Sequence, residues 1–118
     1  MTRTPVHETR DNIFADLGRP EAAAHYLKAQ IVAELYRLAS VRKLTQAKAG
    51  TLMGISQPEV SRLFKGHFHE YSVERLLAFL TAFDCDVEIV ARPRTSTSLR
   101  GQVSFRPART RAVAARRL

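Results

Sequence analysis

Polar side chains between residues 57 and 65 have the chemistry that reads DNA bases. In the sequence QPEVSRLFK, Val60 and Leu63 have the spacing of the buried side of a helix. The same helix would carry two exposed ridges, one with Gln57, Ser61 and Lys65 and the next with Pro58 and Arg62. In the major groove, glutamine pairs with adenine, arginine with guanine, and serine with either base. This spacing therefore predicts a helix that contacts the base edges of double-stranded DNA.

Further polar residues around this helix are candidates for contacts with the DNA backbone. Gln46 falls in the first turn of the preceding helix, where its amide and the unbonded N–H groups of that turn suit a phosphate. Lys43, Lys65 and Arg42 supply cations, although a solvated surface charge explains each of them equally well. The predicted DNA-binding residues are Lys43, Gln46, Ser56, Gln57, Ser61, Arg62 and Lys65. The alternative for the whole region is a helical hairpin that serves only the core.

The remaining reactive side chains form no catalytic or metal-binding pattern. His67 and His69 offer only two ligands, and no cysteine pair stands near them to complete a tetrahedral zinc site. Cys85 is the only cysteine, and a buried structural thiol is the favoured interpretation. Asp86 and Glu88 would share one face of a strand, where a charged edge that discourages aggregation explains them better than a divalent cation does. The sequence also lacks a glycine-rich phosphate loop and a nucleophile beside a base, so we predict no enzyme, no cofactor and no metal site.

The first long helix is expected over residues 21–42. Pro20 and Glu21 suit its first turn, because proline lacks the N–H that would be unbonded there and glutamate favours the positive end of the helix dipole. Four apolar residues recur at intervals of three and four and so share one face: Leu27, Ile31, Leu35 and Leu38. The far side of this helix carries Lys28, Gln30, Glu34 and Arg37. Upstream, a short turn that docks on the body or on a partner subunit is predicted from Ile13, Phe14 and Leu17.

Two short helices are predicted around Gly54. Thr45 caps the first, and Gly54 ends it with the left-handed conformation that helix ends often need. Ser56 and Glu59 fit a capping box, so the second helix is expected over residues 57–65. The small residues expected to face inward, where they let the two helices cross closely, are Ala47, Ala49 and Gly50.

A fourth helix and one strand are predicted in the region that comes next. Ser72 caps the helix, which has an unbroken apolar stripe formed by Val73, Leu76, Leu77, Leu80 and Phe83. From residue 86 the apolar period changes to two, and this alternation predicts a short strand that ends before Pro93. A lone strand cannot satisfy its own backbone groups. We therefore predict that it pairs with a second copy of the chain, giving a homodimer, or with another protein.

Charge is distributed unevenly along the 118 residues, which suffice for one folded domain with tails. Residues 1–92 carry 12 Lys and Arg against 11 Asp and Glu, whereas residues 93–118 carry seven arginines and no acid. The net charge of +8 is therefore no argument that the domain itself is a basic nucleic-acid binder. We predict an N-terminal arm over 1–20 with the docked turn, a DNA-binding domain with the strand over 21–92, and a flexible arginine-rich tail over 93–118, in which residues 102–105 could form a short strand.

The expected compartment is the cytoplasm. No apolar run approaches the ~20 residues that span a bilayer, and the N-terminus lacks the apolar core of a secretory signal. A single cysteine cannot form an internal disulfide. We expect a protein of a reducing compartment with no membrane partner.

Three stretches resemble the helix-turn-helix of the XRE family, the regulators of Cro and lambda-repressor type: Leu44-Thr45-Gln46, Gly54-Ile55-Ser56-Gln57 and Val60-Ser61-Arg62-Leu63. Residues 12–18 and the stretch from Ser72 to Val90 are similar to the HigA-type antitoxin subgroup. The resemblance covers about residues 12 to 92. It implies a mainly α, lambda-repressor-like bundle of four to five helices followed by one short strand, and dimeric DNA binding. It also implies Gln46 at a phosphate and Gln57, Ser61 and Arg62 at the operator. Pro58 departs from the family pattern, because many relatives have a polar side chain there, and the family does not predict the basic tail.

The leading functional hypothesis is a homodimeric, sequence-specific DNA-binding regulator, expected to be a repressor. A second hypothesis is an antitoxin that mainly binds and neutralises a toxin, of the mRNA-cleaving ribonuclease type, with autorepression as feedback. A third makes the arginine tail the functional part, as a nucleic-acid binder without sequence preference.

Overall fold

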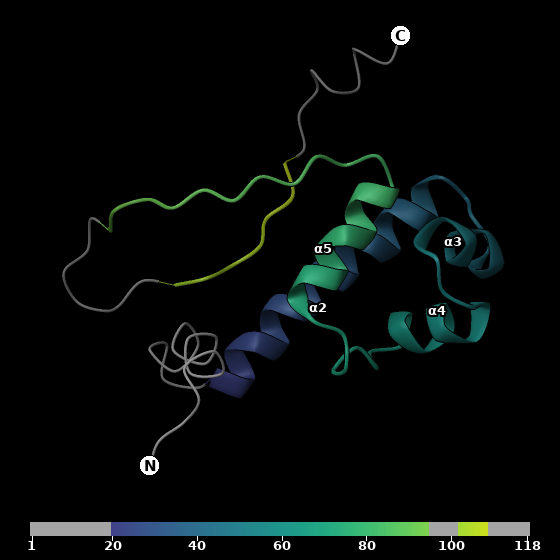
Figure 1. Ribbon diagram of the computed structural model, residues 1–118, viewed down its shortest axis with the longest axis horizontal. Helices are drawn as coiled ribbons and strands as arrows, with labels where there is room; N and C mark the ends of the chain where they lie inside the picture. Colours follow the sequence, from purple (N-terminus) through teal and green to yellow (C-terminus); the bar gives the residue numbers. More distant parts are fainter. Residues whose placement is uncertain (1–19, 95–101, 109–118) are drawn as a thin grey trace, which may run out of the picture.

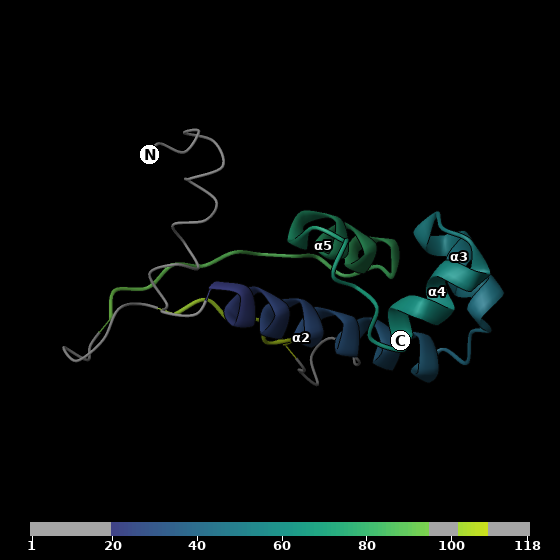
Figure 2. The ribbon, with the colours of Figure 1, turned by 90° about the horizontal axis from the view of Figure 1, so that it is seen from below.

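A computed structural model describes residues 20–94 and 102–108 of the chain. Four helices are found in these residues: α2 (Pro20–Val41), α3 (Gln46–Met53), α4 (Gln57–Phe64) and α5 (Val73–Ala82). The long helix α2 and helix α5 lie along each other. Helices α3 and α4 lie together at the C-terminal end of α2 (Figures 1 and 2). The predicted N-terminal turn at residues 13–17 lies outside the described residues. The predicted bundle of helices is thus confirmed.

The helix starts agree with the predicted caps. The side-chain oxygens of Thr45, Ser56 and Ser72 each accept the backbone N–H three residues later, at 3.1, 3.3 and 3.0 Å. Each of these bonds satisfies one of the N–H groups that a helix leaves unbonded in its first turn. Local chemistry therefore fixes where α3, α4 and α5 begin.

The core lies where the apolar faces of the helices meet. Its fully buried members come from all four described helices: Ile31 and Leu35 in α2, Ala49 in α3, Val60 and Leu63 in α4, and Leu76 in α5. Two buried aromatic residues, Phe68 and Phe79, were not predicted. Of the three small residues predicted to face inward from α3, Ala49 and Gly50 are buried, whereas Ala47 is exposed, so that prediction was wrong for Ala47.

Glu34 corrects the predicted outer face of α2. It is buried, although the pattern placed it on the far side of the helix. Arg37 donates to both carboxylate oxygens of Glu34, from Nε at 3.0 Å and from Nη2 at 2.8 Å, and this hydrogen bonding raises the pKa of Arg37. A buried carboxylate needs such a partner, because removing a charge from water is costly.

No strand is present in the described part of the chain, so the strand predicted at residues 86–92 and the optional strand at 102–105 are not formed there. Residues 85–94 leave the end of α5 without helix or strand pairing (Figure 1). The apolar side chains of this segment point to solvent, and Ile89 is 84% exposed. The physical reason is that a strand exists only when a second backbone pairs with it, and a single chain offers none here.

Residues 102–108 return along α2. They are extended, and within them Phe105 and Pro107 are half-buried while the residues between and beside them are exposed. The Phe105 ring packs against the core. No helix among the described residues is both long and apolar enough to cross a membrane.

Candidate nucleic-acid interface

Two glycines allow the turn between α3 and α4, Gly54 by its backbone conformation and Gly50 by its lack of a side chain. Gly54 has a φ of 78°, and its N–H donates to the carbonyl of Gly50 at 2.7 Å. At Gly50 a Cβ atom would lie 2.6 Å from the carbonyl oxygen of Ile55, closer than real Cβ atoms come. Gly54 therefore supplies a left-handed backbone and Gly50 supplies space. Together they allow α4 to cross closely over α3.

A capping box fixes the first turn of α4. The Ser56 backbone N–H donates to Glu59 Oε1 at 2.9 Å, and the Ser56 hydroxyl donates to the same oxygen at 3.2 Å. The bond from the Ser56 backbone is the main reason that the pKa of Glu59 is lowered from its ordinary value. Ser56, one of the predicted DNA-binding residues, is thus exposed but already engaged in the cap.

Gln46 and Gln57 form a pair that the sequence pattern did not predict. Gln57 Nε2 donates to Gln46 Oε1 at 2.8 Å, which joins the first turn of α3 to the first turn of α4. An amide offers two donor hydrogens and an acceptor oxygen, so one bond leaves most of the capacity of both side chains for other partners. The signal that could have found the pair is the helix-turn-helix spacing itself, because it brings the two helix starts together.

The other predicted residues are placed around this pair and along α4. Arg62 and Lys65 are exposed and Ser61 is half-buried, so all three reach the surface of α4 or its end. Lys65 follows the last residue of α4 as its C-cap. Lys43 is exposed in the turn between α2 and α3, where it has a φ of 56°. The candidate interface, defined as Lys43, Gln46, Gln57, Ser61, Arg62 and Lys65, therefore draws on three successive segments.

Arg42 is not part of this interface. It donates to the carbonyl of Phe83 at 3.0 Å and to Asp84 Oδ2 at 2.8 Å, and its guanidinium lies 5.5 Å from the centre of the Phe83 ring. These contacts tie the end of α2 to the end of α5. Arg42 thus serves the fold, and the phosphate role considered for it from the sequence stays a prediction.

The residues with metal-binding or redox potential stay apart. Within the described ranges, no group of three or more His, Cys, Asp or Glu side chains could hold a metal ion. Phe68, between the two histidines, is buried with its ring centre 4.9 Å from that of His25. Cys85 is half-buried, and burial raises the pKa of its thiol.

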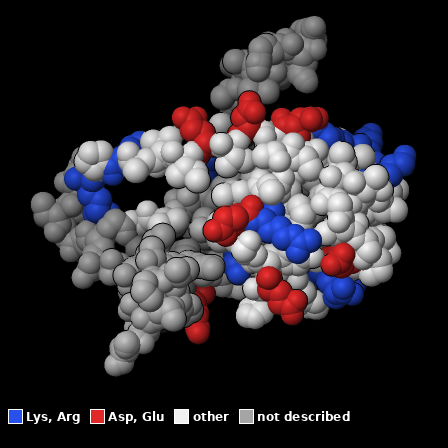
Figure 3. Space-filling model, viewed as in Figure 1, with Lys and Arg blue, Asp and Glu red and all other residues white. Residues whose placement is uncertain are grey.

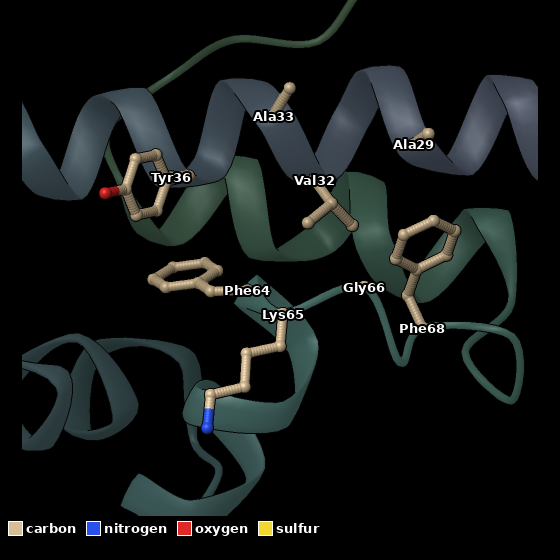
Figure 4. A pocket seen from close by; sticks show the side chains of 8 residues that line it. All are labelled: Ala29, Val32, Ala33, Tyr36, Phe64, Lys65, Gly66 and Phe68. Carbon is tan, nitrogen blue, oxygen red and sulfur yellow. The ribbon is translucent and has the colours of Figure 1, made fainter.

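A shallow apolar groove of about 320 Å³ lies between α2 and the end of α4 (Figure 4). The rings of Tyr36 and Phe64 meet edge to face with 5.3 Å between their centres, and Lys65 lies at the rim. This ring contact helps hold the end of α4 against α2. The sequence pattern gave no sign of it, because Phe64 and Tyr36 lie on no predicted core face.

Charges of both signs share the surface seen in Figure 3, and Lys and Arg gather at the edge over α3 and α4. The near balance of charge in residues 1–92 is consistent with this mixed surface. The described surface in Figure 3 therefore shows no broad positive field, so an argument for DNA binding has to rest on particular side chains.

Comparison with known proteins supports the motif. No curated protein matches the chain. A solved structure described as a candidate XRE family transcriptional regulator shares 35% sequence identity with a TM-score of 0.71, and the alignment covers 75% of this chain and 100% of that one. A family model described as "Helix-turn-helix domain" matches residues 13–92. Because this match spans more than half of the chain and includes α3, the turn and α4, the protein belongs to the helix-turn-helix domain family and is similar to XRE family regulators.

Proposed function

We propose that the protein is a sequence-specific transcriptional repressor that binds double-stranded DNA as a homodimer and places α4 in the major groove. The observation that carries the proposal is the amide pair Gln46–Gln57 at the joined starts of α3 and α4, together with the exposed side chain of Arg62 on α4. Amide and guanidinium groups presented by one short helix match the hydrogen-bonding pattern of base edges.

The residues of the interface divide into two roles in this proposal. Gln57, Ser61 and Arg62 lie along α4 and read bases. Gln46, Lys43 and Lys65 lie at the margins of the motif, where they bind phosphates and set the position of α4 in the groove. Ser56 acts indirectly, because its capping box holds the first turn of α4 in place.

Dimerisation through residues 86–92 is the second part of the proposal. This segment is extended, carries the exposed apolar residues Val87, Ile89 and Val90, and has backbone groups suited to pairing with a second copy. A two-fold symmetric pair would present two copies of α4 to half-sites one helical turn apart, about 34 Å. A palindromic operator would result from that symmetry.

The test is fluorescence anisotropy of the full chain with DNA from upstream of its own gene and with a scrambled duplex, at two salt concentrations. Arg62→Ala should weaken binding to the specific site by ~1–3 kcal/mol and change binding to the scrambled duplex little. Arg75→Ala removes the same charge from an exposed residue of α5, outside the motif and outside residues 86–92, and should affect neither selectively. Equal losses on both duplexes would show that Arg62 contacts phosphates and would remove it from the base-reading set.

A second candidate function is an antitoxin that covers a toxin and represses its own gene. The observation that favours it is again segment 85–94 with its exposed apolar residues Val87, Ile89 and Val90, which could pair with another protein instead of a second copy. Co-expression with the product of the neighbouring gene separates the two candidates. An antitoxin should co-purify with that product, and Ile89→Asp should abolish the complex.

A further inference from the structure

Residues 102–108, here called the docked segment, make a long-range contact with α2. The side-chain amide of Gln30 in α2 binds both backbone groups of a single residue of this segment. Gln30 Nε2 donates to the carbonyl of Phe105 at 3.0 Å, and the backbone N–H of Phe105 donates to Gln30 Oε1 at 3.3 Å. An amide that pairs with both groups of one residue imitates the partner strand that an extended segment otherwise needs.

The side chains of the docked segment support the same placement. Phe105 and Pro107 are half-buried, and Ser104, Arg106 and Ala108 are exposed. Such alternation is the pattern of an extended segment that lies with one side on a surface. The Phe105 ring adds apolar contact with the core to the two hydrogen bonds. Gln30, which the sequence pattern placed on the far side of α2, is therefore half-buried beneath this contact.

The course of the docked segment determines the point from which the end of the chain departs. Residues 85–94 run from the end of α5 away from α3 and α4, and the docked segment then runs beside α2 back toward that end (Figures 1 and 2). Gln30 lies on the flank of α2 opposite Val32, a residue of the groove beside α4, because two residues turn a helix by about 200°. Docking thus directs the chain back toward α3 and α4. The docked segment lies on the side of α2 away from α4, so it does not cover α4.

The residues after the docked segment carry the strongest charge in the chain. Ten residues come after Ala108, and they include Arg109, Arg111, Arg116 and Arg117. Ten extended residues reach up to ~34 Å. The distance along α2 from Gln30 to its last residue, Val41, is only about 16 Å. A tail that starts from the docked segment is therefore long enough to pass the end of α2 where α3 and α4 lie.

We propose that the flank of α2 around Gln30 is a docking site for residues 102–108, and that this docking lets the arginine-rich end of the chain bind phosphates of the DNA beside the site read by α4. The DNA part rests on the proposed function. Without docking, the tail would be tethered only from Arg94, with 24 residues after it in place of ten. Because effective concentration falls roughly as the −3/2 power of tether length, docking should raise the tail's concentration at the DNA about fourfold.

The docking is tested without DNA by amide hydrogen exchange in the full chain. The Phe105 amide should exchange more slowly than the amides of Ser104 and Arg106, and Gln30→Ala should abolish this protection. Val103→Ala changes an exposed side chain of the same segment and should leave the protection in place. Unprotected exchange of Phe105 in the wild-type chain would overturn the docking site.

The role of the tail is tested by DNA binding of four full-length proteins. They are the wild type, Phe105→Ala, a variant with the four tail arginines changed to glutamine, and the combination of both changes. Phe105→Ala should weaken binding about fourfold when the arginines are present and not at all when they are glutamines. Removal of the arginines should also lower the salt slope by about 0.9 for each phosphate that the tail no longer neutralises.

Two results would contradict the proposal in different ways. An equal loss from Phe105→Ala in both backgrounds would mean that Phe105 only supports the fold, and a thermal unfolding curve of each variant would register that loss of stability. Absence of DNA binding by all four proteins would overturn the proposed function together with the role of the tail. In that case the exchange measurement still decides the docking site independently.

Discussion

At Gly50 a single missing methyl group determines how closely α3 and α4 approach. Alanine usually stabilises a helix by up to ~1 kcal/mol relative to glycine. Here its Cβ would meet the backbone carbonyl of Ile55 at 2.6 Å, and a backbone atom cannot move aside as a flexible side chain can. We therefore expect Gly50→Ala to lower the free energy of unfolding by ~1–3 kcal/mol, measured by urea denaturation. Lys48→Ala, at an exposed position of the same helix, should be nearly neutral; a stabilised Gly50→Ala would contradict the close crossing.

Glu59 gives the start of α4 a dependence on pH. Its carboxylate accepts the Ser56 N–H, which lowers the pKa of Glu59 in the folded chain below the ordinary value of about 4.3. Stability from a group with a lowered folded pKa is fully present above the unfolded pKa and is lost as the pH falls through the folded pKa. The wild type should therefore be more stable than Glu59→Gln at neutral pH, and the difference should shrink as the pH falls below about 4.3.

Thermal unfolding of the two proteins between pH 7 and pH 3 measures this difference. The stability difference should shrink at low pH because protonated glutamic acid and glutamine are both neutral. A difference that stays constant over the whole range would mean that the carboxylate charge contributes nothing to the cap.

At the scale of elements, the turn at Gly54 is a backbone requirement and not a packing requirement. No heavy atom lies within 4 Å of the position that a Cβ would take, yet the φ of 78° belongs to the left-handed region. Gly54→Ala should therefore cost ~1–2 kcal/mol by the conformation alone. Gly54→Asn should cost less, because asparagine tolerates that region better. Urea denaturation of both variants checks the order, and equal costs would point to a cause other than φ.

The helix ends show how elements are joined across the molecule. Arg42 bonds to Phe83 and Asp84 and so connects the ends of α2 and α5, while Gln46 and Gln57 connect the starts of α3 and α4. One connection holds the long helices together and the other joins the two helices of the motif. A polar residue at a helix end can thus stabilise the packing of the long helices or join the two helices of the motif, depending on its hydrogen-bond partner.

For the whole molecule, the exposed segment after α5 determines the assembly that we expect. Ile89 is apolar and almost fully exposed in the single chain, which favours burial against a second copy. Ile89→Asp should shift the protein from dimer to monomer in sedimentation experiments, because pairing would then bury a charge at the centre of the contact. Val103→Asp places the same charge on another exposed apolar residue and should leave the dimer intact. A dimer unchanged by Ile89→Asp would exclude pairing through residues 86–92.

Features that arise from short-range chemistry follow from the order of the amino acids alone. Thr45, Ser56 and Ser72 marked helix starts, because a cap needs only a side-chain oxygen and an N–H three residues later. Gly54 marked the turn, and the spacing of Leu27, Ile31 and Leu35 marked the face of α2 that is buried. The surface position of Gln57, Arg62 and Lys65 came from the same helical periodicity.

Contacts between residues far apart in the chain depend instead on how the helices pack. It paired Gln46 with Gln57, buried Glu34 beside Arg37, turned Arg42 toward Asp84 and placed Phe105 on Gln30, 75 residues away. Helical periodicity cannot predict such partners, because it fixes the direction of a side chain around its own helix and not what another segment brings to it. The predicted strand at 86–92 is not formed in the single chain for a related reason, since the pattern describes one backbone and a strand requires two.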